Sequence, residues 1–160
     1  MKNRKMNNKG FSLVELIIVI AIMAVLVGVL APAYLRYVEK SRKSADIQAI
    51  DSIMIAMEVT AMGTEFDMKA DDTMVATFTN GDLDFSATTS VTESASKVIA
   101  ELKAVIGSYT TRSVEFKNFV VTGTVGNDGD VDFTISGDDA DKVINYSDFE
   151  GRLTQVQGNS

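Results

Sequence analysis

The sequence predicts an α+β fold in which a long N-terminal helix packs against an antiparallel β-sheet head. Three observations predict it: an apolar run near the N-terminus, an amphipathic helical pattern directly after it, and segments typical of strands in the second half. The chain has 160 residues, of which 46% are hydrophobic. That length suits one compact domain with an additional segment rather than two full domains.

The first observation is a run without charged residues from Leu16 to Leu35. As a helix this run is about 30 Å long, which is enough to cross the hydrocarbon core of a bilayer. Gly28 and Pro32 lie inside the run and are expected to soften the helix. We therefore predict that residues 11–35 form a transmembrane half of the helix.

The helical pattern continues beyond this run, because neither Gly nor Pro interrupts the chain from Ala33 to Thr60. Apolar residues recur at three- and four-residue spacing and mark one face: Ile47, Ile50, Met54, Met57 and Ala61. Residues 36–62 are thus expected to form the amphipathic half of one continuous helix. The apolar face of this half requires a partner surface, which residues 63–160 must supply as a globular head.

Four segments of the head have the composition of strands. They are Met74–Phe78, Leu83–Phe85, residues 114–125 and residues 131–136. Asn80-Gly81 between the first two is a tight-turn signal. The Gly- and Asp-rich residues 126–130 between the last two indicate a second antiparallel hairpin.

A second helix is expected between these two hairpins. Ser90 and Glu93 have the spacing of a capping box, apolar residues follow at helical spacing, and Gly107 is placed to end the helix. The tail over residues 138–160 is polar and is expected to be a loop, with one strand around residues 152–156.

The charge distribution divides the chain into three parts. Residues 1–10 carry four basic residues and no acid, whereas residues 59–160 carry seven basic and 17 acidic residues. The positive-inside rule therefore predicts a cytoplasmic leader over residues 1–10 and an acidic head on the outside. Because the head is acidic, we expect no direct contact with nucleic acid.

The composition excludes several classes of enzyme and metal site. The chain contains no cysteine and no histidine, which excludes zinc fingers, iron–sulfur clusters, thiol catalysis and Ser-His-Asp hydrolysis within it. The carboxylates of the head are scattered over turns without a second catalytic residue type. We therefore expect no enzymatic activity and no cofactor.

Four aspartates have part of the spacing of an EF-hand loop: Asp128, Asp130, Asp132 and Asp139. Phe133 stands where such a loop requires glycine, and a hairpin turn explains Asp128-Gly129 more simply. They are retained as a calcium candidate, but no metal is expected.

The most informative stretch is Lys9-Gly10-Phe11-Ser12-Leu13-Val14-Glu15-Leu16. It joins a basic leader to Gly, Phe, a small hydroxyl residue, two apolar residues, Glu and an apolar helix. This pattern resembles the N-terminal signature of type IV pilins and pseudopilins. The resemblance covers about residues 1–60 and includes Pro32, which stands at the family's helix-softening position.

The resemblance implies a processing pathway. A prepilin peptidase would cleave after Gly10 on the cytoplasmic side and then N-methylate the new amino terminus at Phe11. The precursor would be a single-pass protein of the inner or cytoplasmic membrane with its body outside, surrounded by lipid. Pilus assembly machinery would then draw it into a helical filament of identical subunits, together with minor pilins.

Glu15 requires a partner on physical grounds. A carboxylate in an apolar helix costs roughly 2.5–3.5 kcal/mol at the membrane centre and less near the interface. After cleavage, the amine of Phe11 lies four residues away and can meet Glu15 within one helix, or Glu15 can meet the amine of a neighbouring chain. The resemblance favours the neighbouring chain, where the pair would set the axial register of the subunits.

The function expected is a structural subunit of a type IV pilus-like surface filament that serves adhesion, motility or aggregation. The alternative is a pseudopilin of a type II secretion or competence system. A further alternative is a single-pass, membrane-anchored extracellular binding module. An ordinary signal peptide cleaved after Ala33 is disfavoured, because the apolar run is long, contains Glu15 and continues as a helix.

Overall fold

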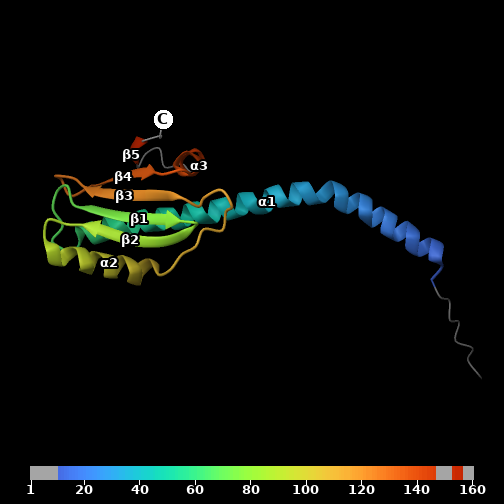
Figure 1. Ribbon diagram of the computed structural model, residues 1–160, viewed down its shortest axis with the longest axis horizontal. Coiled ribbons are helices and arrows are strands. Elements are labelled where there is room, and N and C mark those ends of the chain that lie inside the picture. Colours follow the sequence, from blue (N-terminus) through green and yellow to red (C-terminus); the bar gives the residue numbers. More distant parts are fainter. Residues whose placement is uncertain (1–10, 147–152, 157–160) are drawn as a thin grey trace, which may run out of the picture. The chain divides into compact units, whose positions relative to one another are not determined.

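The computed structural model describes residues 11–146 and 153–156 (Figure 1). In chain order the elements are α1 (Leu13–Met62), β1 (Thr73–Thr79), β2 (Asp82–Thr88), α2 (Thr92–Ile106), β3 (Phe119–Val125), β4 (Val131–Ser136), α3 (Ala140–Tyr146) and β5 (Leu153–Val156). The chain divides into two compact units, Met1–Val38 and Glu39–Ser160. The predicted α+β class and the long N-terminal helix are confirmed.

The second unit contains a five-stranded sheet with the strand order β2-β1-β3-β4-β5. The first four strands are antiparallel, as predicted, whereas β5 pairs with β4 in the parallel direction. A parallel neighbour requires a crossover, and the segment that contains α3 supplies it. The predicted antiparallel sheet therefore forms from four strands, and the strand expected around residues 152–156 joins it as a parallel edge strand.

The turn between β1 and β2 forms as the Asn80-Gly81 signal predicts. Asn80 has a φ of 53° and Gly81 a φ of 92°, the left-handed pair that a two-residue hairpin requires. The two strands are longer than expected, and each gains residues at both ends. Figure 1 shows α2 beside β2 and α3 beside β4.

The core lies between one face of the sheet and the two longer helices of the second unit. Alternate residues of the strands are buried, as a period of two requires: Met74, Ala76, Phe78, Phe119, Val121, Phe133 and Ile135. From α1 they meet Ile50, Ile53, Met54 and Met57, and from α2 Val98 and Leu102. The rings of Phe78 and Phe119, paired across β1 and β3, stack with their centroids 4.2 Å apart. The amphipathic half of α1 thus finds its partner surface in the head.

The predicted capping box at the start of α2 does not form. The residue before the helix is Val91, and no side chain caps the first turn. The N–H and Oγ of Ser90 both donate instead to Oδ1 of Asp72, each at 2.6 Å. Gly107 does end the helix, with a φ of 73°.

The expected strand over residues 114–125 begins only at Phe119, and the tail contains a helix that was not predicted. The backbone N–H groups of Lys117 and Asn118 donate to Oδ2 of Asp139, both at 2.9 Å, rather than to a neighbouring strand. Because a carboxylate binds these donors, the ladder cannot extend through them. The helix α3 then begins directly after Asp139.

Candidate functional site

The side chains of Ser12 and Glu15 both accept hydrogen bonds from backbone N–H groups in the first turn of α1. The backbone N–H of Ser12 donates to Oε2 of Glu15 at 2.8 Å, and the N–H of Val14 donates to Oγ of Ser12 at 3.3 Å. The N–H of Leu16 donates to the carbonyl oxygen of Ser12 at 3.2 Å, as the first bond of the helix. Ser12 is therefore the N-cap, and Glu15 bonds back to it as in a capping box.

This arrangement directs the Glu15 carboxylate toward the N-terminal end of the helix. It accepts from the amide that joins Phe11 to Ser12, so it lies one residue from the nitrogen of Phe11. Sequence reasoning missed the part played by Ser12. The signal was present, because Ser12 and Glu15 have the same spacing as the Ser90 and Glu93 pair to which a capping box was assigned.

An unbroken apolar surface follows this turn. Every residue from Phe11 to Tyr37 is exposed, and Phe11 itself is 95% exposed. Within the described residues, α1 is the one helix long and apolar enough to cross a membrane, and none of its most apolar 18-residue window is buried by the chain. So much exposed aliphatic surface is unfavourable in water, so it must be covered by lipid or by other protein.

Gly28 and Pro32 lie one turn apart in the exposed apolar half of α1. Pro32 has no N–H, so the carbonyl of Gly28, four residues earlier, loses its helical partner. A Cβ atom at Gly28 would meet nothing within 4 Å apart from the adjacent backbone of its own helix. The helix nevertheless continues through both residues. The expected softening at this turn stays a prediction.

Comparison with protein families places a known motif on this segment. Residues 5–31 match the prokaryotic N-terminal methylation motif. This is the prepilin-type signature. It supports a type IV pilin-like or pseudopilin-like protein, and it implies processing by a prepilin peptidase and assembly into a pilus-like filament. No curated protein and no solved structure matches the chain.

The prepilin-type signature covers all the residues predicted for processing. Gly10 lies outside the described residues, and Phe11 is the first residue after it. In the uncleaved chain the nitrogen of Phe11 is an amide, so the expected ion pair with Glu15 has no cation until cleavage creates one. The signature and the exposed apolar helix fit a membrane-anchored precursor.

In the second unit, a buried carboxylate of α1 holds the loop between α2 and β3. Asp46 is fully buried and accepts three hydrogen bonds. Its Oδ1 accepts from the Tyr109 hydroxyl at 2.6 Å and from the Arg112 N–H at 2.9 Å, and its Oδ2 accepts from the Ser113 N–H at 2.7 Å. Burial and the Asp46 carboxylate together raise the pKa of Tyr109, so its hydroxyl stays a donor.

Two further residues on the same face of α1 bind this loop. Oε1 of Glu39 accepts from Ser113 Oγ at 2.6 Å and from the Val114 N–H at 2.9 Å. Nζ of Lys43 lies 2.6 Å from Oε2 of Glu115. Burial raises the pKa of Glu39, but the bonds from Ser113 and Val114 and the nearby cations outweigh burial and hold it below its ordinary value. We call Glu39, Lys43 and Asp46 the stem clasp.

Asp72 and Asp139 hold two other loops in the same way. Oδ2 of Asp72 accepts from the Lys69 N–H at 2.8 Å, in addition to the two bonds from Ser90. Burial raises the pKa of each aspartate, but hydrogen bonds to the ionised form outweigh it, so both pKa values lie below the ordinary 3.8. With no cysteine in the chain, buried carboxylates serve here as the long-range links between loops.

These lowered pKa values predict loss of stability in acid. An aspartate whose pKa is lower in the folded chain stabilises the fold fully above its unfolded pKa, and this contribution is lost as pH falls through the folded value. The melting temperature of the full-length chain in detergent is therefore expected to be level from pH 7 to about 5 and to fall below about pH 4. Asp72→Asn should have a lower melting temperature than the parent chain at pH 7, and its melting temperature should fall less steeply below about pH 4. An acid slope as steep in Asp72→Asn as in the parent chain would contradict this assignment.

The four aspartates of the calcium candidate do not come together as a site. Asp128, Asp130 and Asp132 are exposed at the β3–β4 hairpin, whereas Asp139 is buried and bonded to Lys117 and Asn118. Within residues 11–146 and 153–156 there is no group of three or more acidic side chains arranged to hold a metal ion.

Proposed function

We propose that this chain is the structural subunit of a type IV pilus-like surface filament, cleaved after Gly10 and N-methylated at Phe11. One observation carries the proposal: the methylation motif over residues 5–31 runs directly into an apolar helix surface that its own chain leaves exposed. The proposed role is structural, without catalysis by this chain.

Assembly would exchange lipid for protein contact along this surface. Small residues recur at three- and four-residue spacing in the apolar half: Ala21, Ala24, Gly28 and Ala31. Small residues let helix backbones approach closely where lipid gives no hydrophobic driving force. The open space at Gly28 leaves room for a neighbouring helix. The acidic heads would then form the outer surface of the filament.

Glu15 would link successive subunits. In the precursor its carboxylate accepts from a neutral amide, the Ser12 N–H. Cleavage would create a cationic amine at Phe11, and bonds between ionised groups are about twice as strong as neutral ones. The carboxylate is therefore already at the end of the helix where the amine of its own or a neighbouring chain would arrive.

We favour a surface pilus serving adhesion, motility or aggregation over a pseudopilin of a secretion or competence system. The head over residues 63–160 is larger than covering the amphipathic half of α1 requires, and it is rich in Thr and Asp. Such a head suits an exposed outer surface.

Electron microscopy and mass spectrometry of material sheared from the cell surface test this proposal together. We expect filaments whose subunit begins at N-methylated Phe11. A soluble monomer that still begins at Met1, or a processed chain that begins at Tyr34, would contradict it. The same preparation separates a filament subunit from an anchored single module, which shearing would not release as filaments.

A further inference from the structure

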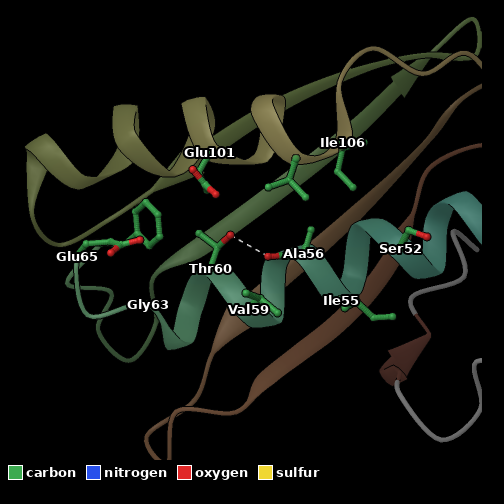
Figure 2. A pocket seen from close by; sticks show the side chains of 11 residues that line it. Ser52, Ile55, Ala56, Val59, Thr60, Gly63, Glu65, Glu101 and Ile106 are labelled. Carbon is green, nitrogen blue, oxygen red and sulfur yellow. Dashed lines mark hydrogen bonds between the residues drawn. The ribbon is translucent and has the colours of Figure 1, made fainter.

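A groove of about 470 Å³ lies between α1 and α2 in the second unit (Figure 2). Its lining includes Ile55, Val59, Gly63, Glu65, Glu101 and Val105. Ile55 and Val59 lie one turn apart on α1, and Val105 faces them from α2. The exposed fractions of Ile55, Val59 and Val105 are 42%, 65% and 60%. Three aliphatic side chains gathered around one groove form a surface that favours an apolar occupant.

The charged groups that line this groove are all negative. Glu65 and Glu101 are exposed at its rim, and Figure 2 shows Glu101 extending from α2 toward α1. No lining residue is basic, and neither glutamate forms an ion pair within the described part of the chain. The chemistry therefore selects an occupant with an apolar body and cationic groups beside it.

The chain itself carries a helix face of that chemistry. Arg36 and Lys40 are four residues apart on α1, and Tyr37 lies three residues before Lys40, so the three share one face. All three are exposed, and Tyr37 is 73% exposed. Neither Arg36 nor Lys40 forms an ion pair with any described residue.

We propose that the groove of one copy binds the Arg36-Tyr37-Lys40 face of a second copy. The Tyr37 ring packs against Val59 and Val105, and the two cations reach the rim glutamates. This inference rests on the proposed function, because assembly into a filament brings the α1 helices of two copies side by side.

The contact must join different copies. Tyr37 and Val59 are 22 residues apart on one helix, which is about 33 Å at about 1.5 Å per residue. Parallel copies in this contact are therefore staggered by about that distance. An ion pair between Glu15 and the Phe11 amine of a neighbour needs a stagger of only about 6 Å by the same rise, so the two contacts involve different neighbours.

The absence of natural cysteines allows a direct test by disulfide crosslinking. Two full-length copies that differ in an epitope tag are expressed together in the assembling host, one with Tyr37→Cys and the other with Val59→Cys, and are then oxidised. We expect a heterodimer that carries both tags. Val114→Cys is the matched control for Val59→Cys, because Val114 is an equally exposed valine, at 67%, that does not line the groove. It should crosslink at least tenfold less.

Exchanging the charges tests the proposed contact between the rim glutamates of one copy and the cations of the other. Glu101→Lys should reduce the crosslink severalfold, and Lys40→Glu in the other copy should restore it. A Val59–Val59 dimer in place of the heterodimer, or a crosslink of Val59→Cys to a different protein, would overturn the inference.

Analysing sheared filaments and membranes separately distinguishes failure of this inference from failure of the proposed function. If sheared filaments beginning at Phe11 form without the Tyr37–Val59 crosslink, the groove assignment fails and the filament proposal stands. If the heterodimer forms in membranes but no filament is recovered, the groove assignment stands and the filament proposal fails.

Discussion

Replacement of Glu15 by alanine is expected to abolish filament formation while membrane insertion and cleavage after Gly10 continue. Removing the carboxylate makes the helix more apolar, so insertion is not impaired. It also removes the expected partner of the Phe11 amine. A hydrogen bond to a charged group contributes about 1.5–3 kcal/mol, or roughly 10- to 150-fold per subunit contact. Because the contact repeats along a filament, the yield of sheared filaments should fall below detection.

Two further substitutions separate the ion pair from the helix cap. Glu15→Gln keeps an acceptor for the Ser12 N–H but loses the negative charge, and we expect it to fail in assembly almost as completely as alanine. Ser12→Ala removes the Oγ acceptor of the Val14 N–H and leaves the Glu15 charge intact, so it should still assemble. Normal filament yield from Glu15→Gln, measured by immunoblot of the sheared fraction, would refute the charge assignment.

Replacement of Asp46 by alanine is expected to destabilise the head by about 3–5 kcal/mol, because three hydrogen-bond donors lose their acceptor at once. The Tyr109 hydroxyl and the N–H groups of Arg112 and Ser113 all lose their acceptor in a buried or half-buried site. Each unsatisfied donor costs about 1–3 kcal/mol. The loop should also become accessible to protease. Thermal unfolding of the full-length chain in detergent measures the effect.

Two control variants provide a scale for this loss of stability. Tyr109→Phe removes one donor and leaves the two backbone bonds to Asp46, so it should cost about 1 kcal/mol. Asp130→Ala changes an exposed aspartate and should stay within about 0.5 kcal/mol of the parent chain. If Asp46→Ala had the same melting temperature as Asp130→Ala, the bonds of Asp46 would contribute nothing to the stability of the head.

Periodicity predicted the elements whose signals are local. The buried face of α1 and the hairpin at Asn80-Gly81 follow from spacing and turn chemistry over a few residues. Contacts between carboxylates and distant backbone N–H groups leave no such signal. Asp46 binds Ser113 across 67 positions, and Asp139 holds residues 117 and 118, which is why β3 starts at Phe119. The short helix α3 lay in a tail whose polar composition indicated a loop.

The methylation motif could be recognised from the sequence because its residues follow one another closely along the chain. Gly10, Phe11 and Glu15 stand in one short motif, whereas the groove needs α1 and α2 side by side. Val105 illustrates the difference: it shares the helical spacing of the apolar residues of α2, yet it is 60% exposed and lines the groove. A helical pattern identifies an apolar face but not which of its members the protein itself will cover.

The stem clasp has a mechanical consequence. In a filament of such subunits, tension carried along α1 passes into the head where the two are joined, and the bonds of Glu39 and Asp46 to residues 109–114 lie at the first turns of that junction. Several bonds attach one loop to one helix face, so they share the load and must yield nearly together before the sheet is pulled. We therefore expect the bonds of Glu39 and Asp46 to be loaded before the buried face of α1 that packs against the sheet.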